Sequence, residues 1–178
     1  MTSAWIGLGS NLGASLSILA DAVDGIRSLD ATRLRDVSPA YRTPPWGVTN
    51  QPDFFNAVVE VETEQSPRQL LENLLEIEQR LGRRRNDQHW GPRLIDLDLL
   101  IYADRQLDEP DLIVPHPHLQ ERAFVLVPLN DLAPDLHVPG QGPVSDLLSR
   151  LDETERGSLR VMADWNGSEW NTKHREVS

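Results

Sequence analysis

The segment WGPRLIDLDLLIY, residues 90–102, constrains the fold more than any other part of the chain. It has the apolar content of a buried strand, yet Asp96 and Asp98 stand in its middle. Because the side chains of a strand alternate between its faces, both carboxylates point to one face, about 7 Å apart. The opposite face, which supplies burial, takes Leu97, Leu99 and Ile101. Two ionised carboxylates repel each other and lose hydration on burial, so the acidic face needs a cation or solvent beside it.

A hard divalent cation is one way to compensate the two carboxylates. The chain has no cysteine, so no thiolate ligand is available, and oxygen ligands favour Mg²⁺ or Mn²⁺. Two carboxylates can also bridge a pair of such ions roughly 4 Å apart, an arrangement that holds a phosphoryl group during transfer. The alternative is that the DLD sequence lies on a solvated sheet face and has no role. Its spacing alone does not decide between the two.

Arginines near this strand favour phosphate chemistry. The net charge of −11 argues against general nucleic-acid binding, which depends on clustered basic residues. Within this acidic chain, however, Arg83, Arg84 and Arg85 are consecutive, and Arg93 lies just before the strand. Carboxylates that hold a metal and arginines that contact phosphate oxygens are the two components of a phosphoryl-transfer site. The alternative for the arginine run is a solvated loop.

The order of the elements predicts an α+β fold. Hydrophobic periodicity and turn residues predict strands at 4–8, 32–37, 56–63 and around 96–102, helices at 15–29 and 67–81, and a proline-rich loop at 43–52. In the strand at 56–63, one face is expected to be core and the other largely polar. The resulting β-α-β-β-α-β order is ferredoxin-like, with an antiparallel sheet and helices on one face.

The chain after Tyr102 is less regular. Residues 113–118 are expected to form a loop, and short helices are expected within 119–132 and at 144–151. From about Asp152 the sequence becomes polar, with Trp165 and Trp170 as its bulky aromatic residues. We therefore expect a single domain over residues 1–150 and a loosely packed or disordered tail of unknown role over 151–178.

Two further motifs invite a ligand-binding interpretation. The stretch GLGSNLG, residues 7–13, lacks the G-x-G-x-x-G spacing of dinucleotide-binding loops and the lysine of a Walker A loop. It is interpreted as a tight turn in which Ser10 and Asn11 serve the start of the following helix. His116 and His118 could ligate a metal, but hydrogen-bond donation to a phosphate fits the arginines better.

Nothing in the sequence suggests a membrane protein. No apolar run approaches the roughly 20 residues of a membrane-spanning helix, and the N-terminus lacks the pattern of a signal peptide. We expect a cytoplasmic protein that works as a monomer on small molecules and binds neither nucleic acid nor membranes.

Five segments in order carry a resemblance to a known family: GSNLG (9–13), YRTPPWG (41–47), QPDFFNAV (51–58), WGPRLIDLDLLIY (90–102) and VPHPHLQERAFVLVPL (114–129). Together they resemble the 6-hydroxymethyl-7,8-dihydropterin pyrophosphokinases of folate biosynthesis, over residues 1 to about 150. The resemblance implies a ferredoxin-like α/β/α scaffold. It also implies transfer of the β,γ-diphosphate of ATP to the pterin hydroxymethyl oxygen, with release of AMP.

The resemblance also implies roles for individual residues. It implies that Asp96 and Asp98 hold two Mg²⁺ ions and, with Arg83 and Arg93, form the catalytic set. The positions implied for ATP binding are Glu78, Arg83, Arg85, Trp90, Arg93, His116 and Arg122. The positions implied for the pterin are Thr43, Pro44, Pro45, Trp46, Gly47, Phe54, Asn56 and Phe124. Aromatic rings that stack on a flat heterocycle and an amide that contacts its polar edge suit such a ligand.

Two other functions use the same residues. A metal-dependent phosphohydrolase or nuclease would use the carboxylates and arginines but attack with water. A ferredoxin-like regulatory module would bind a nucleotide and leave it intact. Phosphate release without a pterin would indicate the first, and binding without turnover would indicate the second.

Overall fold

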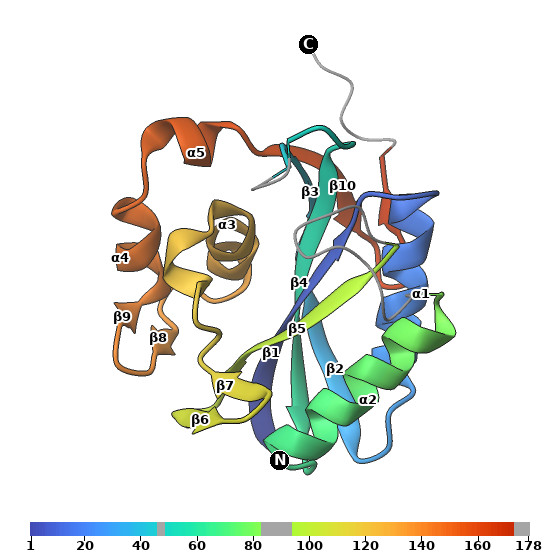
Figure 1. Cartoon of the computed structure of the whole chain (residues 1–178), viewed down its shortest axis with the longest axis vertical. Coiled ribbons are helices and arrows are strands. Elements are labelled where there is room, and N and C mark those ends of the chain that lie inside the picture. The colour runs from blue at the N-terminus through green and yellow to red at the C-terminus, as the bar shows by residue number, and fades with distance from the viewer. Residues whose placement is uncertain (46–48, 83–93, 173–178) are drawn as a thin grey trace.

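The computed structural model describes residues 1–45, 49–82 and 94–172, and in this part of the chain an antiparallel sheet lies between two layers of helices (Figure 1). The strands of the sheet are β1 (Thr2–Ser10), β2 (Thr32–Val37), β3 (Ala40–Thr43), β4 (Phe54–Thr63), β5 (Asp96–Tyr102), β10 (Arg160–Trp165) and β11 (Trp170–Asn171). Their order is β11-β10-β3-β4-β1-β5, with β2 also paired to β4.

The remaining elements are short strand pairs and helices. The helices are α1 (Ser15–Arg27), α2 (Pro67–Arg80), α3 (Ala123–Leu132), α4 (Val144–Ser149), α5 (Glu153–Gly157) and the 3-10 turn η1 (Leu119–Glu121). Two small hairpins are formed by β6 (Leu107–Glu109) with β7 (Leu112–Val114), and by β8 (His137–Val138) with β9 (Gly142–Pro143). The predicted strands at 4–8, 32–37 and 56–63 and both predicted helices are therefore present, with small changes at their ends. The sequence analysis missed β3 and the β6–β7 hairpin, which lie among prolines.

Helices cover both faces of the sheet, so the α/β/α arrangement is confirmed. On one face α1 and α2 form a core with residues such as Ile6 and Val59. On the other face α3 and α4 form a second core with residues such as Trp5 and Val58. The expectation from element order that helices lie on one face holds only for α1 and α2. Similarly, the face of β4 expected to be largely polar begins with the fully buried Val58 and becomes polar only towards Glu60.

An irregularity in β5 changes which side chains share a face. In its pairing with β1, Ile6 lies opposite Leu99 while Trp5 lies opposite Ile101, so Leu100 is an extra residue in β5. Such a bulge turns the following residue to the other face. Ile101 consequently packs in the α3–α4 core, and the prediction that it shares a face with Leu97 and Leu99 is wrong.

The C-terminal segment is ordered over most of its length. β10 pairs antiparallel with β3, and Ala163 and Trp170 are buried. The rings of Trp165 and Trp170 meet edge to face at 4.8 Å. The expectation of a loosely packed or disordered tail is therefore wrong for residues 153–171, because a few apolar side chains and the open edge of β3 are enough to order it. Residues 173–178 lie outside the described part of the chain.

Helix α2 has the end signals that its sequence predicts. Ser66 Oγ accepts a hydrogen bond from the Gln69 backbone N–H at 3.2 Å, and the Gln69 side chain accepts one from the Ser66 N–H at 2.9 Å. This reciprocal capping box satisfies two N–H groups that the helix itself leaves unpaired. Pro67 occupies the first turn, and Gly82 follows the helix with a φ of +99°.

The capping box gives a stability prediction. Replacing Ser66 with alanine should lower the free energy of unfolding by about 1 kcal/mol, measured by urea denaturation, because the Gln69 N–H loses its acceptor. Ser17→Ala, at an exposed position within α1, is the matched control and should not destabilise the protein. Equal stability of Ser66→Ala and the wild type would contradict a capping role.

Candidate active site

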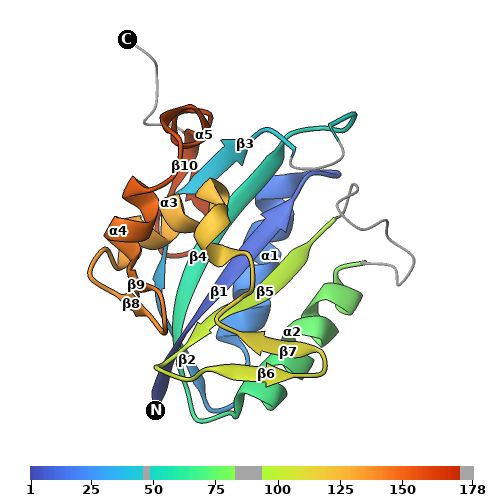
Figure 2. The same cartoon turned by 60° about the vertical axis from the view of Figure 1, so that its left-hand side comes forward.

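A pocket lies between the sheet and the start of α3, on the face opposite to α1 and α2. The space between its lining residues amounts to about 690 Å³, part of which is open to solvent. Its walls come from β1, β3, β4, β5 and α3, elements that are far apart in the sequence but adjacent in space (Figure 2). The lining residues are Gly7, Leu8, Gly9, Thr43, Pro44, Phe54, Asn56, Ala57, Val58, Asp96, Asp98, Leu100, Arg122, Phe124 and Val125.

Both aspartates of the DLD sequence line this pocket. Their strand, β5, pairs with β1 so that Asp96 lies opposite Gly9 and Asp98 lies opposite Gly7. Glycine has no side chain, and at Gly7 the Leu100 side chain takes this space, with a methyl group 3.3 Å from where a Cβ atom would stand. The prediction that both carboxylates point to one face is confirmed, and that face borders a cavity between two layers of the protein.

Gly9 leaves room for the side chain of Asn56 on the neighbouring strand β4. Gly9 lies opposite Asn56 of β4, and a Cβ atom built on Gly9 would be only 2.9 Å from the Asn56 Oδ1. Such a contact is too short for a carbon and an oxygen, so a side chain at this position would displace the amide. The Asn56 Nδ2 in turn donates a hydrogen bond of 2.6 Å to the Thr43 Oγ1. Asn56 is thus held in the pocket wall by Thr43 and by the absence of a side chain at Gly9.

Arg122 places a positive charge on the α3 side of the pocket. Its side chain is buried, and its guanidinium carbon lies 5.6 Å from the centre of the Phe124 ring. A guanidinium at this distance over an aromatic face is attracted by the ring quadrupole. Arg122 and Phe124, both predicted site residues, therefore lie side by side at the start of α3, across the pocket from β5.

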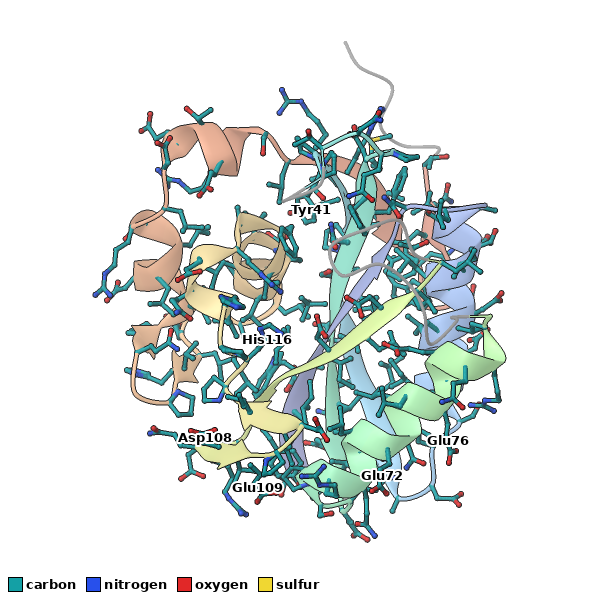
Figure 3. The ribbon with its side chains drawn as sticks, in the orientation of Figure 1. Tyr41, Glu72, Glu76, Asp108, Glu109 and His116 are labelled. Carbon is teal, nitrogen blue, oxygen red and sulfur yellow. The ribbon has the colours of Figure 1, made fainter. Side chains whose placement is uncertain are left out.

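His116 lies between the sheet and α3 (Figure 3). Its backbone N–H donates to the Leu100 carbonyl at 2.8 Å, and its Nδ1 accepts from the His118 N–H at 3.3 Å. Burial and the nearby charge of Arg122 lower the pKa of His116 from 6.5 to about 4. The ring is therefore neutral at pH 7, and because its Nδ1 accepts a hydrogen bond, its Nε2 carries the proton and is a donor.

Glu78 lies on the other side of β5 from the pocket. It belongs to α2, is 2% exposed, and its Oε1 accepts a hydrogen bond of 2.7 Å from the Leu97 backbone N–H. Leu97 lies between the two aspartates, so Glu78 supports the strand that carries them. This support was not foreseen from the sequence, and a contact of Glu78 with the nucleotide stays a prediction.

Eight of the predicted site residues line this pocket: Thr43, Pro44, Phe54, Asn56, Asp96, Asp98, Arg122 and Phe124. Pro45 is described but does not line the pocket. Trp46, Gly47, Arg83, Arg85, Trp90 and Arg93 lie outside the described residues.

Some pocket residues were missed by the sequence analysis. The floor contains Gly7 and Gly9, which belong to β1 rather than to the expected tight turn. The Asn11 Nδ2 donates to the Gln51 side chain and the Pro52 carbonyl, both at 2.9 Å, whereas the Ser10 Oγ donates to the Oγ of Ser15, the first residue of α1, at 3.2 Å. The alternation of glycines at positions 7 and 9 within an apolar strand was the available signal for a close approach.

The described residues contain no group of three or more histidine, aspartate or glutamate side chains placed to hold a metal. An ion bound by Asp96 and Asp98 alone would complete its coordination with water or ligand oxygens, which is common for Mg²⁺. In the same part of the chain, no helix is both long and apolar enough to cross a membrane.

A carboxylate pair, a buried arginine, aromatic rings and a fixed amide line one pocket, a combination that suits an enzyme acting on a phosphate substrate beside a flat heterocycle. Comparisons with known proteins identify the family. Residues 5–134 match the family model described as 7,8-dihydro-6-hydroxymethylpterin-pyrophosphokinase (HPPK). A Methylorubrum extorquens protein named 2-amino-4-hydroxy-6-hydroxymethyldihydropteridine pyrophosphokinase is 47% identical over 152 residues, covering 85% of this chain and 95% of that protein.

Further similarities lie in sequence and in fold. A Pseudomonas aeruginosa protein of the same name is 46% identical over 145 residues, covering 82% of this chain and 89% of that protein. A crystal structure of Plasmodium falciparum HPPK-DHPS with pterin and p-hydroxybenzoate matches 96% of this chain and 46% of that chain, with a TM-score of 0.72 at 16% identity. This chain thus spans about half of that one, and the likeness concerns the fold. The chain belongs to the HPPK family and is a pyrophosphokinase.

The shifted pKa of His116 predicts a pH dependence of stability in the protein without ligands. Between about pH 6.5 and pH 4, the unfolded chain binds a proton at this residue that the folded chain does not, so the free energy of unfolding falls as the pH falls. From pH 7 to pH 5 this amounts to about 2 kcal/mol. His116→Gln should therefore lose about 2 kcal/mol less than the wild type over this range, measured by urea denaturation at each pH.

His137→Gln, on the exposed part of β8, controls for the loss of an imidazole elsewhere. Identical losses in the wild type and His116→Gln would contradict the lowered pKa of His116.

Proposed function

We propose that this chain transfers the β,γ-diphosphate of ATP to the hydroxymethyl group of 6-hydroxymethyl-7,8-dihydropterin in this pocket, releasing AMP, as a step in folate biosynthesis. The observation that carries the proposal is the shared pocket: the carboxylates of Asp96 and Asp98 and the fixed amide of Asn56 line the same cavity. A metal–phosphate site and a heterocycle site that share one cavity suit a reaction between two bound substrates.

The pterin would occupy the part of the pocket next to β3 and β4. Phe54 and Phe124 offer aromatic faces to a flat ring system, and Asn56 offers both a donor and an acceptor to its polar edge. The Thr43 hydroxyl accepts from Asn56 Nδ2, which determines the orientation of the amide. The remaining predicted contacts for the pterin are Pro44, Pro45, Trp46 and Gly47.

The ATP phosphates would lie next to β5 and α3. Asp96 and Asp98 would hold Mg²⁺, two ions in this proposal, and the bound metal would neutralise the phosphate charge. Arg122 adds a fixed positive charge, and the neutral His116 donates a hydrogen bond through Nε2 without adding further charge. The other proposed ATP contacts are Glu78, Arg83, Arg85, Trp90 and Arg93, with Arg83 and Arg93 also in catalytic roles.

The reaction is an in-line displacement at the β-phosphorus. The pterin hydroxyl oxygen forms a bond to this phosphorus while the bond to the oxygen that bridges the α- and β-phosphorus breaks. The hydroxyl proton passes to solvent or to a pocket carboxylate, and AMP leaves with the bridging oxygen. Fixed donors and cations around the transferred group stabilise the charge that develops on it.

The proposal includes the setting in which the enzyme works. It is a monomer in the cytoplasm that acts on two small molecules.

The test of the proposed function is the formation of AMP from ATP and Mg²⁺, with and without 6-hydroxymethyl-7,8-dihydropterin. The proposal predicts AMP and a diphosphorylated pterin only when the pterin is present. Release of ADP or phosphate without the pterin would instead indicate a phosphohydrolase, and an absence of nucleotide turnover under both conditions would indicate a binding module.

The metal-binding role of the carboxylates gives a specific prediction. Asp98→Ala should lower the rate of AMP formation by more than about 100-fold, because one of the two protein ligands of the metal is removed. Pterin binding to Asp98→Ala, measured by titration calorimetry, should persist, since its proposed contacts lie on β3, β4 and α3.

Asp108→Ala, on the exposed strand β6 away from the pocket, is the matched control and should keep wild-type activity (Figure 3). Full activity of Asp98→Ala would exclude the proposed metal site.

A further inference from the structure

The C-terminal hairpin, defined here as β10, β11 and the turn between them (residues 160–171), contacts the strand that forms one wall of the pocket. We propose that this hairpin is a positioning element for the acceptor substrate: it holds β3 so that Thr43 and Asn56 keep the orientation that binds the pterin. The inference rests on the proposed function for the identity of the ligand. The matched family model spans residues 5–134, so the hairpin lies outside the part of the chain that this model covers.

The first contact is the pairing of β10 with β3. β3 has only four residues, and three of them, Tyr41, Arg42 and Thr43, pair with β4. On its other edge, Ala40 lies opposite Ala163 and Tyr41 lies opposite Val161. A strand this short has little stability of its own, so the second neighbour contributes much of its order. Figures 1 and 2 both show β10 beside β3 at the outer side of the sheet.

The second contact fixes the corner where β3 begins. The Trp170 indole is 7% exposed, and its Nε1 donates a hydrogen bond of 2.9 Å to the Ser38 carbonyl. Ser38 is itself bound to β4, since its backbone N–H donates to the Val58 carbonyl and its Oγ accepts from the Val58 N–H, both at 2.9 Å. A buried indole N–H needs a hydrogen-bond acceptor, and removal of this N–H would leave the Ser38 carbonyl without the donor. Trp170 therefore holds the corner between β2 and β3.

The third contact anchors the hairpin to the rest of the protein. The Arg27 Nη2, at the end of α1, donates a hydrogen bond of 2.9 Å to the Gly167 carbonyl in the turn between β10 and β11. Trp165 packs edge to face against Trp170 at 4.8 Å, which fixes the indole from within the hairpin. The hairpin is thus attached to α1 at its turn and to β3 along β10.

The path from the hairpin to the pocket is short. From Ser38 the chain runs through β3 to Thr43, which lines the pocket and accepts the 2.6 Å hydrogen bond from Asn56. The Tyr41 hydroxyl also donates to the Asp131 carboxylate of α3, so β3 is connected to the helix that carries Phe124. A displacement of the corner at Ser38 would therefore alter the Thr43–Asn56 bond.

The sheet order predicts which substrate is affected. β3 is separated from β5, which carries Asp96 and Asp98, by the two strands β4 and β1. Loosening the hairpin should therefore weaken pterin binding and leave the metal–phosphate side nearly unchanged. A general loss of stability would have no such selectivity.

The test compares Trp170→Phe with the wild type in the full-length protein. The substitution keeps an aromatic ring and removes the N–H donor, so it should raise the KM for the pterin about fivefold, as for loss of one buried hydrogen bond. The KM for ATP and kcat should change less than twofold. Ile26→Val, in the core at the end of α1, is a matched destabilising control and should leave both KM values unchanged.

A second readout does not depend on activity. In the unliganded protein, Trp170→Phe should shift the NMR signals of the Asn56 side-chain amide and speed amide hydrogen exchange in β3, whereas Ile26→Val should do neither. Unchanged Asn56 signals and unchanged pterin KM, or an equal rise in both KM values, would overturn the inference. If the wild type made no AMP with the pterin, the proposed function would fail, and the NMR comparison alone would decide whether the hairpin positions Asn56.

Discussion

The structure depends on the placement of two like charges on a strand whose other face is buried. Asp96 and Asp98 are tolerated in β5 because the face of the strand that carries them borders a pocket that water or a cation can enter. Two hydrogen bonds support the backbone of this strand. The Glu78 carboxylate accepts one from the Leu97 N–H, and the Leu100 carbonyl accepts one from the His116 N–H. These bonds satisfy backbone groups of β5, which among the strands of the described residues pairs with β1 alone.

The pocket is divided by the order of the strands. β5 and the start of α3 supply charge, through the two aspartates and Arg122, whereas β3 and β4 supply the amide and aromatic groups. The glycine positions of β1 lie between these two sides, and their lack of side chains leaves room for the side chains of Leu100 and Asn56. His116 is neutral at pH 7, so it offers a hydrogen-bond donor beside Arg122 without adding to the positive charge there. The C-terminal hairpin acts on the acceptor side alone in the proposal above.

Local patterns were sufficient to predict much of this arrangement. The alternation of a strand places Asp96 and Asp98 on one face, and the Ser66 cap and apolar spacing predict α2, because both depend on residues close in sequence. The bulge at Leu100 could not be predicted, since it arises from the register between β5 and β1. β3 was not predicted because prolines flank it and because its stability comes from β4 and β10, which pair with it on its two edges. The packing of the hairpin was not predicted because its sequence is largely polar, and the burial of Ala163 and Trp170 depends on elements far away in the sequence. Most pterin-side residues came from the family resemblance.

The measurement that tests the central claim most directly is a crystal structure of the protein with Mg²⁺, a non-hydrolysable ATP analogue and 6-hydroxymethyl-7,8-dihydropterin. The account predicts metal density in contact with both Asp96 and Asp98, and the pterin beside Asn56 with its hydroxymethyl oxygen about 3–3.5 Å from the β-phosphorus. Metal bound away from both aspartates, or a pterin outside the pocket between β4 and α3, would contradict the account.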